Sequence, residues 1–78
     1  MSDFNQEILA LTAKLLKKTV PEILDLLDFE GLIDSLLLVE IIFSFEEEFG
    51  IEFDESDISQ FKTLRNLIIL TERKIDEQ

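Results

Sequence analysis

The 78-residue sequence contains no cysteine, histidine, tryptophan or tyrosine. Without cysteine the chain has no disulfide, no thiol nucleophile of its own and no thiolate metal site. Without histidine, ordinary zinc sites and Ser-His or Cys-His catalysis are excluded as well. Chemistry is left to carboxylates, seven cations and a few hydroxyl groups. This inventory predicts a protein that is not an enzyme and has no metal site.

Long apolar runs are also missing. No window approaches the roughly 18 uninterrupted apolar residues of a membrane span, because Glu40 and Glu46–Glu48 interrupt the richest stretch. The first ten residues, MSDFNQEILA, lack the basic region of a signal peptide. The length suits one domain over residues 1–78. We therefore expect a single-domain, cytoplasmic and monomeric protein without membrane insertion.

Basic residues are scarce and unevenly placed. The chain carries 18 acidic and 7 basic residues, a net charge of −11. All the cations lie in 14–18 or 62–74, and the 13 acidic residues between Thr19 and Phe61 have no cation among them. Such a surface repels nucleic acid and anionic lipid, and it attracts basic protein surfaces. Solubility alone is the other explanation of this charge, and both stay open.

Hydrophobic periodicity predicts an all-α fold. Apolar residues at helical spacing favour a first helix over 3–17, which Ser2 or Asp3 can cap. Pro21 prevents its continuation. The connection 19–33 is apolar enough to be pinned onto the core, with a helical turn near 22–27.

Three further helices complete the prediction. One spans Ser35–Phe49 and ends at Gly50, a short one starts near Ser56, and Thr63 caps the last. The inward residues of the last helix are expected to be Leu64, Leu67, Ile68 and Ile75. The predicted fold is a four-helix bundle with three long helices, one short helix and a long first loop.

The helix predicted over 35–49 carries two apolar stripes. At about 100° per residue, the wider stripe has the width of a core face; it comprises Leu38, Ile41, Ile42, Phe45 and Phe49. Leu36, Val39 and Phe43 form a separate stripe. Glu46 borders this second stripe on one side, and Glu40 and Glu47 on the other. Either the 19–33 connection covers the second stripe, or the stripe docks a partner.

Ser35 stands where this helix begins. A serine there can cap a backbone N–H group, which is worth roughly 1 kcal/mol. The chain holds no base that could activate Ser35 as a nucleophile. Another enzyme could modify its hydroxyl, because an anion attached there would lie at the positive end of the helix.

Residues 31–53, GLIDSLLLVEIIFSFEEEFGIEF, resemble the signature of the acyl carrier protein family. The similarity rests on the Asp34-Ser35-Leu36 helix start, on Val39-Glu40 and on 46–51, EEEFGI, at matching spacing. The order of the predicted elements extends the resemblance to essentially the whole chain.

The resemblance implies that Ser35 carries a covalent 4′-phosphopantetheine arm. A separate phosphopantetheinyl transferase would add it from coenzyme A, and Asp34 and Leu36 would belong to the attachment site. The implied docking positions are Leu36, Val39, Glu40, Phe43, Glu46 and Glu47. The implied partners are an acyl- or aminoacyl-loading ligase and acyl-processing enzymes with basic surfaces.

Two departures from the family pattern favour a specialised carrier of a fatty acid, lipid or polyketide type of pathway. The glycine common three residues before the serine is Leu32 here, with Gly31 one position earlier. Leu37 replaces the acidic residue that often follows the Asp-Ser-Leu motif, and Leu38 occupies the next position. A D-alanyl or aminoacyl carrier is the alternative that Gly31 favours. An acidic helical adaptor that is never modified is a second alternative.

Overall fold

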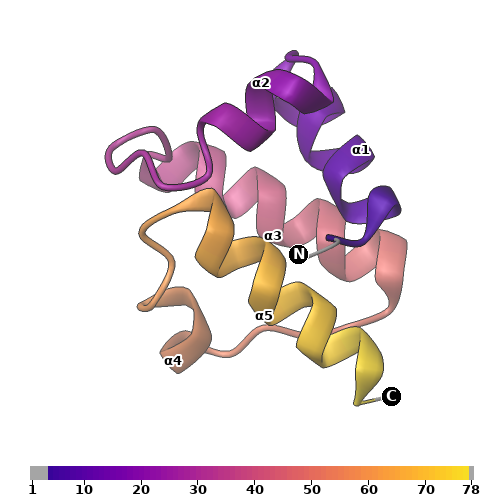
Figure 1. Cartoon of the computed structure of the whole chain (residues 1–78). Helices are drawn as coiled ribbons and strands as arrows, with labels where there is room; N and C mark the ends of the chain where they lie inside the picture. The colour runs from indigo at the N-terminus through magenta and orange to yellow at the C-terminus, as the bar shows by residue number, and fades with distance from the viewer. Residues whose placement is uncertain (1–3, 78) are drawn as a thin grey trace.

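The computed structural model describes residues 4–77, and every regular element in that range is a helix (Figure 1). The helices are α1 (Gln6–Leu16), α2 (Val20–Asp25), α3 (Ser35–Phe49), α4 (Glu55–Ile58) and α5 (Leu64–Asp76). The all-α helical-bundle fold is thus confirmed. The predicted count of four helices was wrong, because part of the long first loop is itself helical.

The additional helix, α2, forms because its first turn is closed by reciprocal hydrogen bonds. Thr19 Oγ1 accepts from the Glu22 backbone N–H at 3.3 Å, and Glu22 Oε1 accepts from the Thr19 N–H at 2.8 Å. Pro21 lies in this first turn, where a missing N–H costs no helical hydrogen bond. Pro21 therefore helps to start α2, whereas α1 already ends at Leu16.

Helix α1 begins later than the sequence indicated. Asn5 is its cap, and its Oδ1 accepts from the N–H groups of Glu7 and Ile8 at 2.8 and 3.3 Å. The expected caps Ser2 and Asp3 lie outside the described residues. At the other end, Lys17 adopts a left-handed conformation with φ 58°.

The later helices match the predictions closely. Helix α3 has the expected bounds and ends at Gly50, whose φ of 65° is the left-handed conformation that glycine adopts without strain. Helix α4 begins at Glu55, one residue before the expected start. Thr63 caps α5 through its Oγ1, which accepts from the Asn66 N–H at 3.2 Å.

One hydrophobic core joins the elements. Its fully buried apolar side chains come from α1, α2, α3 and α5: Ile8, Ile23, Ile41, Phe45, Leu64, Leu67 and Ile68. Ile75, expected inside, is only half-buried. Two buried threonines satisfy their hydroxyls within their own helices, since Thr12 donates to the Ile8 carbonyl and Thr71 to the Leu67 carbonyl, each at 2.7 Å.

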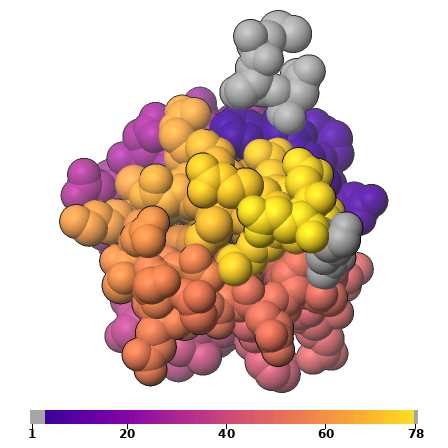
Figure 2. All heavy atoms as spheres, turned by 90° about the horizontal axis from the view of Figure 1, so that it is seen from below, coloured from indigo at the N-terminus to yellow at the C-terminus, as the bar shows by residue number. Residues whose placement is uncertain are grey.

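The short α4 and the segment 50–54 lie beside α5 on the lower face of the molecule (Figure 2). None of the residues of α4 is buried. The anchors of this region are instead Ile51, Phe53 and Phe61, which flank α4 in the chain and are buried. The rings of Phe53 and Phe61 pack edge-to-face with centroids 5.5 Å apart.

The connection 26–34 joins α2 to the start of α3 and is pinned as expected. Leu27 is buried, and its carbonyl accepts from the Arg65 backbone N–H at 3.0 Å. The next residue, Asp28, forms an ion pair with the Arg65 side chain. The chain that leads to Ser35 is therefore fastened to the beginning of α5.

Candidate functional site

Ser35 is the first residue of α3, and Asp34 is the cap. Asp34 Oδ1 accepts from the Leu37 backbone N–H at 2.8 Å, and the Asp34 carbonyl accepts from the Leu38 N–H at 2.9 Å. The alternative in which Ser35 caps this helix is therefore wrong. Asp34 meets that need, and the side chain of Ser35 is exposed.

The start of α3 has room and hydrogen-bond donors for an anion. Within residues 4–77 the structure records no hydrogen-bond acceptor for the backbone N–H groups of Ser35 and Leu36. The first turn of α3 holds no acidic side chain, and Asp34 directly before it is the adjacent carboxylate that opposes a negative group there. An exposed hydroxyl beside free N–H donors at a positive helix end fits a covalently attached phosphate.

The second apolar stripe of α3 is open to solvent. Leu36, Val39 and Phe43 are 73%, 63% and 64% exposed. The alternative in which the 19–33 connection covers this stripe is therefore wrong. On the opposite side of the helix Ile41, Ile42 and Phe45 are buried, as expected.

Three residues expected in or near the core face of α3 lie at its edge: Leu37, Leu38 and Phe49 are half-buried against the core. Phe49 packs edge-to-face on Phe45, with ring centroids 5.8 Å apart.

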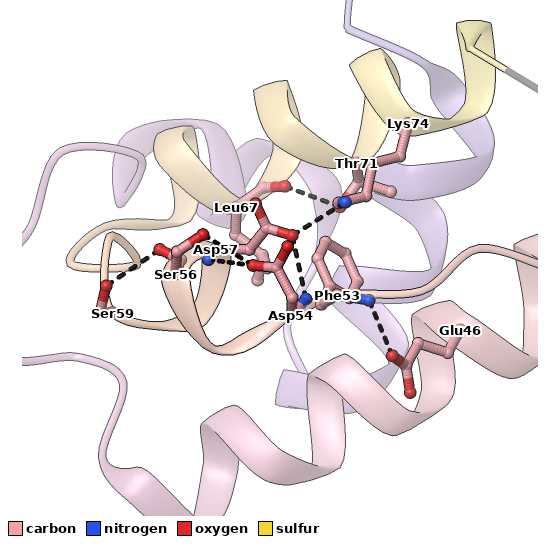
Figure 3. A network of polar contacts seen from close by, with 9 residues as sticks. All are labelled: Glu46, Phe53, Asp54, Ser56, Asp57, Ser59, Leu67, Thr71 and Lys74. Atoms are coloured by element: carbon pink, nitrogen blue, oxygen red, sulfur yellow. Dashed lines mark hydrogen bonds and ion pairs between the residues drawn. The ribbon is translucent and has the colours of Figure 1, made fainter.

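The three acidic side chains beside the exposed stripe have different environments. Glu40 and Glu47 are exposed, whereas Glu46 is half-buried. Glu46 Oε2 accepts from the Phe53 backbone N–H at 2.9 Å (Figure 3). Phe43, Glu46 and Glu47 line one shallow surface hollow together with Ile51 and Glu52. Glu46 therefore borders the stripe while it also holds the segment after α3.

Sequence reasoning missed the residue that fastens the loop before Ser35. Arg65 Nε and a terminal guanidinium nitrogen donate to the two carboxylate oxygens of Asp28 at 2.7 and 3.0 Å. This hydrogen bond lowers the pKa of Asp28 and raises that of Arg65. The two residues lie 37 positions apart. The sequence therefore showed a concentration of cations in 62–74, but not which carboxylate they would contact.

A second polar network fastens α4. Asp54 caps α4 by accepting from the Asp57 N–H at 2.9 Å, and Asp57 forms a 2.8 Å ion pair with Lys74 of α5 (Figure 3). The Asp57 hydrogen bond raises the pKa of Lys74. The backbone hydrogen bond from Asp57, followed by that from the Ser56 hydroxyl, lowers the pKa of Asp54.

Two functional features are absent from the described part of the chain. No helix there combines the length and apolar character needed to cross a bilayer. No group of three or more histidine, cysteine, aspartate or glutamate side chains is placed to hold a metal ion.

Comparison with known proteins relates most of the chain to one family. A family model described as "Phosphopantetheine attachment site" matches residues 6–70. The chain is 36% identical over 42 residues to an acyl carrier protein of Thermotoga maritima, covering 54% of this chain and 52% of that protein. It is 41% identical over 44 residues to one of Solidesulfovibrio magneticus, covering 56% of each. The chain thus spans about half the length of the curated relatives it matches.

Proposed function

This chain belongs to the family of proteins with a phosphopantetheine attachment site, and from that premise we propose that it is a non-catalytic acyl carrier modified at Ser35. The prosthetic group of the family, 4′-phosphopantetheine, supplies a terminal thiol that holds an acyl group as a thioester. That thiol would give a chain without cysteine its part in thioester chemistry.

The observation that carries the proposal is that Asp34 caps α3 and Ser35 does not. Because Asp34 caps α3, the hydroxyl of Ser35 is not needed for the fold and stays exposed. On modification, Ser35 Oγ would lose its proton and form a phosphodiester bond, with the nucleotide part of coenzyme A as leaving group. The N-terminal end of α3 favours the added negative charge by about 0.3–1 kcal/mol.

The exposed stripe and its acidic border support docking of partner enzymes. Leu36, Val39 and Phe43 would enter an apolar patch on the partner, while Glu40 and Glu47 would meet cations around it. Glu46 would contribute charge from the same border. The transferase, a loading ligase and later acyl-processing enzymes are the proposed partners of this monomeric, cytoplasmic carrier.

A specialised acyl pathway is the version that we prefer. No acidic side chain lies in the first turn of α3, and Leu37 and Leu38 there pack against the core. Partner enzymes that recognise an acidic residue directly after the Asp-Ser-Leu motif would therefore lack that contact. A D-alanyl or aminoacyl carrier is the alternative, and Gly31, whose φ is 91°, favours it.

The test is the intact mass of the protein after incubation with coenzyme A, Mg²⁺ and a promiscuous phosphopantetheinyl transferase. We expect the mass of one phosphopantetheine to be added to the wild type and none to Ser35→Ala. An unmodified wild type, beside a control carrier that is modified, would instead support the unmodified adaptor. Incubation of modified protein with an acyl ligase or a D-alanine ligase would then distinguish the two kinds of cargo by mass.

A further inference from the structure

Phe29 is a large apolar side chain left in solvent in the connection before Ser35. It is 56% exposed, although its neighbour Leu27 is buried. Its backbone is ordered by a hydrogen bond from the Phe29 N–H to the Leu26 carbonyl at 3.1 Å. A single exposed apolar side chain is common on protein surfaces, so the case for a role of Phe29 rests on its fixed backbone and on its place in the chain before Ser35.

Arg65 holds the chain next to Phe29 and also contacts the segment before α1. Its side chain forms the two hydrogen bonds to Asp28, and its backbone N–H donates to the Leu27 carbonyl. Its guanidinium also lies 5.9 Å from the centroid of the Phe4 ring, before α1. The two residues directly before Phe29 are thereby fixed, and Phe29 is presented on a preorganised loop.

Phe29 is close enough in the chain to Ser35 for one enzyme to contact both. Phe29 lies six positions before Ser35, which is at most about 20 Å even for an extended chain, and the turn at Gly31 shortens the path. A standard protein interface covers about 800 Å² on each partner, a patch roughly 30 Å across. An enzyme that bonds to Ser35 Oγ must centre its contacts there, whereas one that acts at the end of a long arm need not.

Charge identifies the kind of partner. The loop side of Ser35 carries Asp28, Glu30 and Asp34, and no cation lies between Thr19 and Phe61. Arg65, the cation that reaches this loop, is paired with Asp28. The surface around Phe29 is therefore apolar at its centre and negative around it, which matches a partner patch with an apolar recess and a basic border.

We propose that Phe29 is a second docking anchor, used by the transferase that modifies Ser35, and that the Arg65–Asp28 pair holds it in position. The anchor lies on the loop side of Ser35, and Leu36, Val39 and Phe43 lie on the helix side. This inference rests on the proposed function, because it names a contact of the enzyme that installs the arm.

The first measurement is the steady-state kinetics of arm transfer to purified variants of the whole chain. Phe29→Ser removes the anchor, and Ile69→Ser is the matched control, because Ile69 is also exposed, at 39%, but lies on α5. Helical circular dichroism and thermal unfolding verify the fold of each variant. We expect Phe29→Ser to raise KM about fivefold to tenfold with little change in kcat, as loss of one apolar anchor does. Ile69→Ser should stay within about twofold of the wild type.

The second measurement does not depend on modification. The Ser35→Ala protein should inhibit modification of the wild type competitively, and adding Phe29→Ser should raise its inhibition constant by a similar factor. Arg65→Gln should also raise KM. The exchanged pair, Asp28→Arg with Arg65→Asp, should bring KM back toward the wild-type value.

The outcomes separate the two proposals. A wild type that accepts no arm overturns the proposed function, and this inference with it. A wild type that is modified normally, with equal KM for Phe29→Ser and Ile69→Ser, overturns the anchor alone. Failure of the exchanged pair to restore KM overturns the positioning role of Arg65.

Discussion

Glu46 and Glu47 are neighbours in the sequence and both border the exposed stripe of α3, yet their contacts differ. Glu46 accepts a partly buried hydrogen bond from the Phe53 backbone N–H, whereas the side chain of Glu47 is exposed to solvent. Removing an acceptor from a partly buried N–H group costs about 1 kcal/mol or more. Truncating an exposed side chain costs less than about 0.5 kcal/mol.

This difference can be measured by urea unfolding. We expect Glu46→Ala to lower the free energy of unfolding by about 1–2 kcal/mol, Glu46→Gln to lower it by less because the amide oxygen can still accept, and Glu47→Ala to leave it nearly unchanged. Equal stabilities for Glu46→Ala and Glu47→Ala would show that the Phe53 hydrogen bond contributes nothing. The same variants then separate docking from stability, since Glu47→Ala should weaken partner binding alone.

At the scale of elements, α4 depends on polar contacts more than any other helix does. It is four residues long and has no buried residue, so its own turn cannot be stable in isolation. Asp54 closes its start, and the Asp57–Lys74 pair joins it to α5. The flanking phenyl rings of Phe53 and Phe61 are buried and anchor the chain on both sides.

The cap of α4 predicts a dependence of stability on pH. The folded-state pKa of Asp54 lies below its ordinary value of 3.8, because the Asp57 N–H and the Ser56 hydroxyl bond to its carboxylate. A depressed carboxyl pKa contributes stability that is complete above the unfolded pKa and is lost as the pH falls through the folded pKa. Asp54→Asn keeps a capping oxygen but cannot ionise.

We therefore expect wild type to be more stable than Asp54→Asn at pH 7, and the difference to disappear as the pH falls below about 4. Thermal unfolding of both proteins from pH 7 to pH 3 measures it. Glu47→Gln is the control for removal of one negative charge without a cap. A difference that persists unchanged at pH 3 would contradict an ionisation-linked contribution.

At the scale of the whole molecule, the net charge of −11 outweighs the attractive pairs. Two salt bridges join described residues, Arg65 with Asp28 and Lys74 with Asp57. The exposed Arg65–Asp28 pair is of the kind that contributes about 0–1 kcal/mol, and the Lys74–Asp57 pair is partly buried. Repulsion among 18 carboxylates acts over the entire surface and favours expansion of the chain.

Salt should therefore stabilise this protein. Raising NaCl from 10 to 200 mM shortens the Debye length from about 30 to about 7 Å, which screens the repulsion more than the two close pairs. We expect the melting temperature to rise by roughly 4–8 °C, equivalent to about 1 kcal/mol in a domain of this size. Thermal unfolding by circular dichroism measures this, and a melting temperature that falls with salt would show that the ion pairs dominate.

The structural features that the sequence predicted correctly are those set by residues close together in the chain. The bounds of α3, the glycine at its end and the Thr63 cap of α5 follow from residues within one helical turn, so they were predicted correctly. The helix α2 was underestimated, although its Thr19–Glu22 capping box was present in the sequence. The sequence left open whether Ser35 caps α3, because Asp34 and Ser35 are both good caps and only the backbone decides between them.

The sequence by itself determined the helical class, the two stripes of α3, the charge and the family resemblance, because periodicity and composition carry them. Only the tertiary structure decided that Leu36, Val39 and Phe43 stay in solvent, that Glu46 reaches Phe53, and that Arg65 fastens the loop before Ser35. These facts depend on which segments distant in the chain come to lie together. A pattern confined to one helix shows which faces exist, and packing of the whole bundle decides which of them water still reaches.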